Sequence, residues 1–322
     1  MDDTRYDALV DQIEALYAES RYADAIAVLD AATDLAPWTA ELAHLRACLL
    51  GASGDPEGAL QALRTASRAG SWWRPEILTD DDDLAALTNH PEFQQLVAES
   101  ATRATDAPTP ALITLPEGDT SPDTPSGSGL PGRAPSDDSL RDNKLPDPTR
   151  ARGVVVALHG AGQRAEHAQR DWSAVLDLGY ALVCVESSRR MSPMYRTWPD
   201  PEQAAADIAR ALAELPTELT GLPLIAAGFS AGGRVALNWA LTAQPAPTAG
   251  VLAMAPALRE LPDSSANSLS PATIWIGTDD DLLEVVDAAE SHLSACKIER
   301  LPGLAHAFPA DFAQRLATTV GG

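Results

Sequence analysis

The chain has little positive charge. Of its 322 residues, 23 are lysine or arginine and 46 are aspartate or glutamate, and its only lysines are Lys144 and Lys297. A chain this acidic repels phosphate backbones and anionic lipid headgroups, which argues against nucleic acids and membrane surfaces as partners. It also lacks any run of about 18 apolar residues, so no membrane span is expected. Its 45% apolar content is still enough for a packed core.

Cysteine is scarce as well. Cys48, Cys184 and Cys296 lie far apart, with no Cys-x-x-Cys motif and no Cys/His pairing at zinc spacing. We therefore expect neither a disulfide framework nor a structural zinc site. The first thirty residues carry aspartates where a signal peptide carries lysine or arginine, and they lack a continuous apolar segment. These features predict a soluble, cytoplasmic protein.

The length suits two domains, and the composition changes along the chain. Residues 1–104 are acidic and show helical spacing of apolar residues, which predicts an all-helical domain. Residues 105–322 are expected to form a second, catalytic domain. Within it, residues 117–149 are rich in proline, serine, glycine and aspartate, which predicts a disordered insertion.

The helical region contains a repeated pattern. A small–large–small triplet occurs twice, 34 residues apart, at Ala25, Leu29 and Ala32 and again at Ala59, Leu63 and Ala66. Two successive helical hairpins with this period resemble the tetratricopeptide repeat. The resemblance implies a groove that binds a protein or peptide, or self-association through the repeats. A generic helical bundle is the alternative.

From Gly153 onward, short apolar strands alternate with helical stretches, which predicts a mostly parallel sheet covered by helices on both faces. Residues 111–115 are β-rich and could add an early strand. The other predicted strands are residues 154–158, 181–185, 224–227, 251–254, 273–276 and 297–301. The predicted helices are residues 166–177, 202–214, 232–243, 282–295 and 310–319. In such sheets, chemistry gathers at the carboxyl ends of the strands.

The strongest chemical signal is the Gly-Phe-Ser-Ala-Gly segment at residues 228–232, between a predicted strand and a predicted helix. In this context the pattern is typical of a nucleophile elbow, a turn too tight for side chains on either side of the serine. Gly228 and Gly232 meet that need, and the turn presents the Ser230 hydroxyl at the start of a helix. The alternative is an ordinary strand–helix turn that contains a serine.

A serine nucleophile needs a base, and the base needs an acid. His306 is the histidine in the loop after the last predicted strand, so it is the candidate base. The acid candidates are the consecutive carboxylates Asp279, Asp280 and Asp281, of which repulsion allows at most one to be buried toward the histidine. The chain order of serine, acid and histidine is the one expected for a nucleophile elbow in such a sheet.

Residues from about 108 to 320 resemble the α/β-hydrolase superfamily, most closely its small carboxylesterase/phospholipase and dienelactone-hydrolase-like branch. The resemblance is carried by Leu-His-Gly-Ala-Gly at 158–162, the elbow at 228–232, Gly-Thr-Asp-Asp at 277–280 and the late His306. It implies Asp280 as the acid, with Asp279 second. It also implies that the amides of Ala231 and of Ala161, or else Gly162, bind the oxyanion.

The loop after residues 181–185 should reach the same edge of the sheet as the serine. Its Met191, Tyr195 and Trp198 are candidate substrate-binding residues for an apolar acyl group, although they could equally pack the loop onto the domain. No sizeable lid is evident between residues 255 and 273.

Together these features predict a serine esterase that cleaves carboxylic esters through an acyl-enzyme and needs no metal or organic cofactor. A peptidase or amidase would use the same triad. A non-catalytic scaffold, in which the repeats bind a partner and the hydrolase half is passive, is a third hypothesis.

Overall fold

The computed structural model describes residues 3–116, 151–258, 271–291, 293 and 296–321. The disordered insertion predicted at 117–149 lies outside the described residues. The chain divides into two compact units. The first, here called the helical unit, comprises Met1–Thr109, Gly160–Arg164 and Glu186–Asp207. The second, the sheet unit, comprises Pro110–His159, Ala165–Val185 and Ile208–Gly322. Two loops that follow strands of the sheet thus group with the helices.

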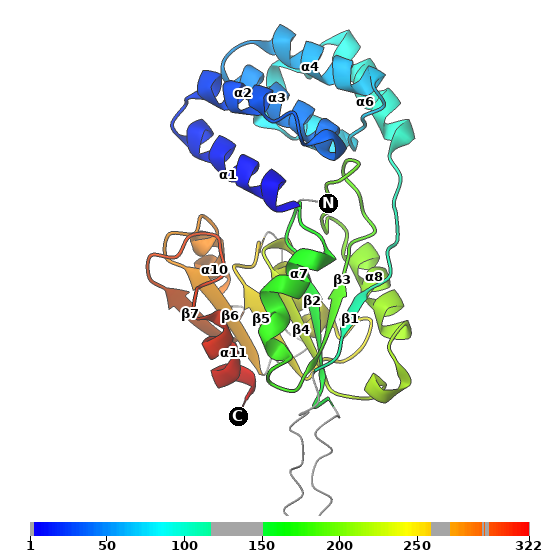
Figure 1. Ribbon diagram of the computed structural model, residues 1–322, viewed down its shortest axis with the longest axis vertical. Helices are drawn as coiled ribbons and strands as arrows, with labels where there is room; N and C mark the ends of the chain where they lie inside the picture. The colour runs from blue at the N-terminus through cyan, green and yellow to red at the C-terminus, as the bar shows by residue number, and fades with distance from the viewer. Residues whose placement is uncertain (1–2, 117–150, 259–270, 292, 294–295, 322) are drawn as a thin grey trace, which may run out of the picture. The chain divides into compact units, whose positions relative to one another are not determined.

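The helical unit is built from helical hairpins, labelled in Figure 1. Ala25 and Leu29 of the first hairpin and Ala59 and Leu63 of the second are all buried, as the 34-residue pattern predicts. The tetratricopeptide character of these hairpins stays a prediction. The elements are α1 (Asp3–Ala18), α2 (Tyr22–Ala31), η1 (Ala36–Trp38), α3 (Thr39–Ala52), α4 (Pro56–Arg68), α5 (Pro75–Thr79), η2 (Asp82–Leu87) and α6 (Pro91–Arg103).

Local sequence sets where these helices begin. Asp55 precedes α4, and its carboxylate accepts a hydrogen bond from the backbone N–H of Gly58 at 2.9 Å. Proline follows directly as the first helical residue, where its missing N–H costs nothing. After α4, the core of this unit is closed by buried apolar residues of η2 and α6: Leu84, Leu87, Phe93 and Leu96.

The sheet unit contains a seven-stranded sheet in the order β1-β3-β2-β4-β5-β6-β7. β1 runs antiparallel to β3, and the other neighbouring strands are parallel. The strands are β1 (Leu112–Thr114), β2 (Val154–Leu158), β3 (Ala181–Val185), β4 (Leu224–Phe229), β5 (Gly250–Met254), β6 (Ala272–Gly277) and β7 (Cys296–Leu301). Every residue of β2 and β3 is buried, which continuous apolar runs of this kind predict for parallel strands.

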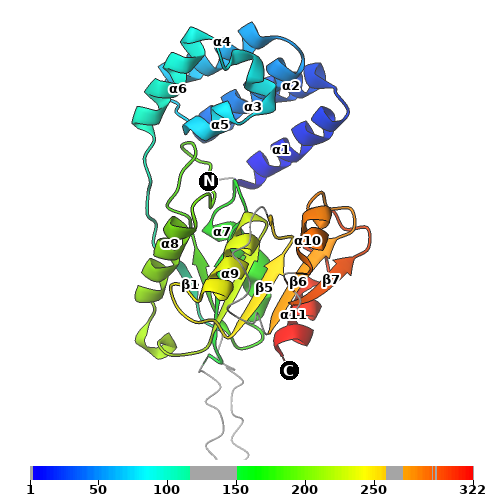
Figure 2. The ribbon, with the colours of Figure 1, turned by 180° about the vertical axis from the view of Figure 1, so that it is seen from behind.

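Helices cover both faces of this sheet. α7 and α11 lie in front of it in Figure 1, whereas α9 lies in front of it in Figure 2, the view from behind. The helices and helical turns are α7 (Ala165–Trp172), η3 (Ser173–Val175), α8 (Pro201–Ala213), η4 (Thr217–Leu219), α9 (Ala231–Thr242), α10 (Leu283–Ala289) and α11 (Phe312–Val320). The predicted fold class, a mostly parallel sheet covered by helices and joined to a helical N-terminal region, is confirmed.

The structure also bears on the cysteines and on membrane-spanning segments. Cys48, Cys184 and Cys296 are all free thiols. Among the described residues, no helix is long and apolar enough to cross a membrane.

Candidate active site

Ser230 lies on a strained turn between β4 and α9. Its φ of 52° and ψ of −118° fall outside the regions that non-glycine residues ordinarily adopt. A Cβ added at Gly228 would lie 2.3 Å from the carbonyl oxygen of Gly232, and one added at Gly232 would lie 2.2 Å from the carbonyl oxygen of Leu158. The two glycines are therefore required by close backbone packing, which is the steric basis of a nucleophile elbow.

Backbone hydrogen bonds hold this strained turn in place. The N–H of Ser230 donates to the carbonyl of Met254 at 2.9 Å, and the carbonyl of Ser230 accepts from Arg234 and Ala257 at 3.1 and 3.0 Å. α9 begins at Ala231, whose amide is in the first helical turn, where N–H groups have no partner within the helix. The Ser230 side chain is half-buried at this helix start.

His306 and Asp280 are joined directly. The Nδ1 atom of His306 lies 2.9 Å from Oδ2 of Asp280, whose side chain is fully buried, whereas the side chain of His306 is 40% exposed. The other carboxylate oxygen of Asp280 accepts the backbone N–H of Leu282 at 2.8 Å. Of the three consecutive carboxylates, Asp279 and Asp281 are exposed. An ionised Asp280 requires the proton on Nδ1, which leaves the lone pair of Nε2 available.

The end of β6 holds the histidine loop. A Cβ added at Gly277 would lie 1.9 Å from the carbonyl oxygen of Leu304, two residues before His306. That carbonyl accepts the N–H of Asp279 at 3.0 Å, and the Thr278 hydroxyl accepts the N–H of Gly303 at 2.8 Å. The Gly-Thr-Asp segment thus positions His306 as well as supplying a carboxylate, a role that was not predicted from the sequence. The glycine directly before the acidic turn was the available signal.

Aromatic packing brings the imidazole beside the elbow. The ring of His306 lies 4.8 Å from the ring of Phe229, the residue before Ser230. Phe308 packs on Phe229 at 5.0 Å and on Trp172 at 5.8 Å. Within the described residues, no hydrogen bond joins the Ser230 hydroxyl to His306. The structure therefore brings Asp280 and His306 into contact and His306 next to the serine turn.

The two oxyanion candidates that follow β2 differ in their hydrogen bonding. Residues 160–163 form a turn in which the N–H of Gln163 donates to Gly160, and Gly162 has a φ of +75°. The amide of Gly162 donates to the carbonyl of Arg196 at 2.8 Å, so it is already engaged. For the exposed Ala161, no acceptor for the amide is found among the described residues. Of the two, Ala161 is the one whose amide is open to a ligand.

The predicted substrate residues lie on the loop between β3 and α8, within the segment Glu186–Asp207 of the helical unit. Met191 and Trp198 are buried, at 5% and 1% exposure, and so pack this loop in the present structure. Tyr195 is partly exposed, and its ring lies 3.0 Å from the position of a Cβ at Gly162. Tyr195 is thus the member of the group that lies against the predicted oxyanion turn.

A buried carboxylate from α3 holds the same loop, and no sequence pattern indicates it. Oε1 of Glu41 accepts hydrogen bonds from the Ser192 hydroxyl at 2.5 Å and from the backbone N–H groups of Met194 and Tyr195 at 2.8 and 3.3 Å. Glu41 is 5% exposed, and its Oε2 has no partner among the described residues. Since Arg196 in turn binds Gly162, one chain of contacts links α3 to the predicted oxyanion turn.

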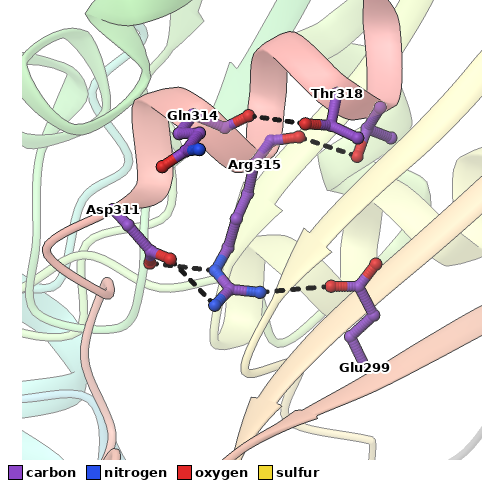
Figure 3. A pocket seen from close by; sticks show the side chains of 6 residues that line it. Glu299, Asp311, Gln314, Arg315 and Thr318 are labelled. Carbon is purple, nitrogen blue, oxygen red and sulfur yellow. Dashed lines mark hydrogen bonds and ion pairs between the residues drawn. The ribbon is translucent and has the colours of Figure 1, made fainter.

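A separate hollow lies where α11 meets β7 (Figure 3), with a volume of about 250 Å³. Arg315 crosses it and pairs with Asp311 at 2.9 Å and with Glu299 at 3.3 Å. These ion pairs are partly exposed, and the lining includes none of the serine, aspartate and histidine candidates. The hollow is a polar surface feature, in contrast to the apolar acyl pocket that the sequence predicts.

Comparison with known families agrees with this architecture. Residues 149–306 match a family described as serine aminopeptidase, S33, and residues 5–108 match one described as A/B hydrolase-like, N-terminal domain. The chain has the α/β-hydrolase fold. The serine elbow, the acidic turn and most of the histidine loop fall inside the first match, and Glu41 falls inside the second.

Several solved structures resemble this α/β hydrolase. A protein of Bacillus cereus ATCC 10987, described as uncharacterized, is 23% identical, with 98% of each chain covered and a TM-score of 0.48. XC6422 of Xanthomonas campestris, described as an α/β serine hydrolase without a lid, is 17% identical over 68% of this chain and 92% of its own (TM-score 0.45). Acyl-protein thioesterase 2 of Zea mays is 18% identical over 53% and 94% (TM-score 0.39). No curated protein matches the chain significantly.

Proposed function

We propose that the protein is a serine hydrolase that cleaves carboxylic esters through a covalent acyl-enzyme. The observation that carries this proposal is the buried Asp280 carboxylate, 2.9 Å from Nδ1 of a His306 whose ring packs beside the Ser230 elbow. A serine hydroxyl is a poor nucleophile at its ordinary pKa and needs such a base. A histidine held by a buried carboxylate is the usual means of activating it.

In the proposed reaction, Ser230 attacks the ester carbonyl while Nε2 of His306 takes the hydroxyl proton. His306 then returns this proton to the leaving alcohol, and the acyl group stays on Ser230. In the second half-reaction His306 takes a proton from water, the water attacks the acyl-enzyme carbonyl, and the carboxylic acid is released from Ser230. Asp280 keeps the proton on Nδ1 and stabilises the imidazolium. Catalytic hydrogen bonds are often long in the absence of substrate and tighten when it binds. The mechanism is therefore compatible with a structure in which Ser230 and His306 are not yet hydrogen-bonded.

The tetrahedral intermediates carry a negative oxygen that needs donors. The amide of Ala231 in the first turn of α9 and the amide of Ala161 after β2 are the proposed pair. The register supports this, because Leu158 of β2 pairs with Gly228 of β4, so both segments leave neighbouring strands at the same edge. Donors of this kind commonly contribute about 3 kcal/mol each to the transition state.

The acyl group is expected to be small or presented at a surface, and Tyr195 is the proposed contact for it, because it lies against Gly162. The helical unit is proposed to position the loop that carries Tyr195, through Glu41. Binding of a peptide partner or self-association through the helical hairpins stays a separate proposal, for which the buried small residues of the hairpins are the only support.

A second candidate is a peptidase or amidase with the same three residues, favoured by the description of the family that residues 149–306 match. The chemistry differs only in the leaving group, an amine instead of an alcohol. Parallel assays on an ester and an amide of one acyl group separate the two candidates.

The test is hydrolysis of a short p-nitrophenyl ester by the full chain. Ser230→Ala should lower kcat by at least about a thousandfold, because it removes the nucleophile but leaves binding intact. Ser53→Ala, on an exposed residue of the helical unit, should keep full activity. Full activity in a folded Ser230→Ala variant would exclude the mechanism. An inactive, folded wild-type protein would favour the non-catalytic scaffold.

A further inference from the structure

Three side chains of metal-binding type converge in the helical unit, apart from the proposed active-site residues. His44 and Cys48 stand four residues apart on α3 and so share one face of the helix. Asp81, just before η2, meets them from another segment. The Sγ of Cys48 lies 3.6 Å from Nε2 of His44 and 3.2 Å from Oδ2 of Asp81, and Nε2 lies 3.5 Å from Oδ2.

These three distances fit a tetrahedral metal site. Zinc bonds of about 2.3 Å to sulfur and about 2.0 Å to nitrogen or oxygen place neighbouring ligand atoms about 3.3–3.6 Å apart. The observed separations of 3.2, 3.5 and 3.6 Å leave room for one ion without rearrangement of the backbone. A hydrogen bond needs only one pair of these atoms to be close, whereas here all three atoms lie close to one another.

The chemistry of the donor set also suits a metal. An imidazole nitrogen, a thiolate and a carboxylate oxygen are all common zinc ligands. One thiolate, from Cys48, and one carboxylate, from Asp81, would neutralise a divalent ion.

The orientation of the third ligand is fixed before any ion binds. Oδ1 of Asp81 caps η2 by accepting the N–H of Asp83 at 3.0 Å, which turns Oδ2 toward His44 and Cys48. The backbone of η2 also lies tightly against α3, where a Cβ at Gly51 would sit 2.0 Å from the carbonyl oxygen of Asp83. The two elements therefore hold the three ligand atoms together through contacts of their own.

We propose that His44 Nε2, Cys48 Sγ and Asp81 Oδ2 bind a divalent transition-metal ion of the zinc type. Binding replaces the proton on the Cys48 sulfur with the metal and releases it to water. It also exchanges the present hydrogen bond between His44 Nε2 and the carbonyl of Ile77, at 3.0 Å, for a metal–nitrogen bond, and the ring proton moves from Nε2 to Nδ1 by exchange with water. The fourth position is left for water, because the side chains of His44 and Asp81 are 19% and 25% exposed.

The bound ion would join α3 to the segment between α5 and η2. It would thereby stiffen α3, which also carries Glu41. Its role is therefore structural, and it is independent of the proposed hydrolase reaction. The proposal differs from the prediction of no structural zinc site. His44 and Cys48 are four residues apart, but the third ligand is 33 residues away from Cys48 and only the fold brings it near.

Cobalt(II) is the direct probe, since a cobalt–thiolate bond absorbs in the near ultraviolet. The full chain, stripped with EDTA, is titrated with cobalt(II), then with zinc(II). We expect a band that saturates at one ion per chain and disappears when zinc displaces the cobalt. Cys48→Ser should abolish the band, and Asp81→Asn should weaken cobalt binding at least about tenfold. Cys296→Ser, the matched control, should keep the band.

Thermal unfolding gives a second readout. Zinc should raise the Tm of the wild-type chain, because it binds the folded state, and it should leave the Tm of Cys48→Ser unchanged. A folded wild-type chain without a thiolate band would overturn the proposal. So would a band that persists in Cys48→Ser, since the sulfur ligand would then be another cysteine. If Cys48→Ser fails to fold, Asp81→Asn and the wild-type titration still decide.

Discussion

The sheet unit and the helical unit assemble their polar groups in opposite ways. In the sheet unit, the serine, aspartate and histidine lie in the segments that follow β4, β6 and β7, so parallel topology brings them to one edge. In the helical unit, Glu41 reaches a loop about 150 residues away, and Asp81 meets a cysteine on another helix. Polar sites at strand ends can therefore be predicted from sequence. Sites formed between distant segments of a helical unit depend on packing, which no local sequence pattern indicates.

The largest effect is expected at the acidic turn of the sheet unit, where three neighbouring carboxylates differ in burial. Asp280→Asn should lower kcat on the order of 10⁴-fold, because an amide in place of the carboxylate favours the wrong histidine tautomer. Asp279→Asn and Asp281→Asn, on exposed residues, are the matched controls and should stay within a fewfold of wild type. Steady-state kinetics on a p-nitrophenyl ester checks this. Equal losses in all three variants would contradict a single buried acid.

Gly277 tests whether the end of β6 positions the histidine loop. In Gly277→Ala, the added methyl group meets the carbonyl of Leu304, so the loop must shift and carry His306 away from Asp280. A displacement of this size should cost about a hundredfold in kcat. Gly250→Ala, where the nearest atom lies 3.3 Å away, is the milder control. Unchanged kinetics in a folded Gly277→Ala variant would show that the loop is positioned otherwise.

Glu41 tests the helical side of the comparison. Glu41→Ala leaves the hydroxyl of Ser192 and the N–H groups of Met194 and Tyr195 without their acceptor. The free energy of unfolding should fall by about 1–3 kcal/mol. Since the loop binds the predicted oxyanion turn through Arg196, kcat/KM should also fall about tenfold or less. Denaturant melts and kinetics measure the two effects. Glu57→Ala, on an exposed residue of α4, should change neither.

The smallest effect is expected at the hollow of Figure 3. Arg315→Ala removes the ion pairs with Asp311 and Glu299, which are partly exposed and screened by water. We expect no change in activity and a decrease in Tm of about 2 °C or less. A large loss of activity, measured on the same ester, would show that this hollow serves the reaction.

The sequence predicted the sheet closely, because each buried parallel strand is an uninterrupted apolar run and each helix follows at once. β2 and β3 coincide with the predicted ranges, and the short antiparallel β1 lies within the predicted segment 111–115. The elbow could be predicted because Gly228 and Gly232 flank a serine between a strand and a helix. The acidic run itself did not distinguish Asp279, Asp280 and Asp281, because burial decides which one meets the histidine and adjacent residues can differ in burial. Only the family resemblance implied Asp280.

Two further features depend on packing. The fold buries Met191 and Trp198 in their loop, which agrees with the alternative that these apolar residues pack the loop instead of lining a substrate pocket. Glu41 looked like one more acidic residue in an acidic region, yet it is buried against three donors. Contacts between segments distant in sequence set both outcomes.

The central claim is that the Ser230 hydroxyl is activated by His306 and Asp280, and covalent labelling tests it most directly. The folded, full-length protein is treated with a fluorophosphonate, and the modified peptide is located by mass spectrometry. We predict one adduct, on Ser230, forming at least about a hundredfold more slowly in Asp280→Asn than in Asp279→Asn. A wild-type chain that stays unlabelled, or that is labelled equally fast when Asp280 is replaced, would contradict the account.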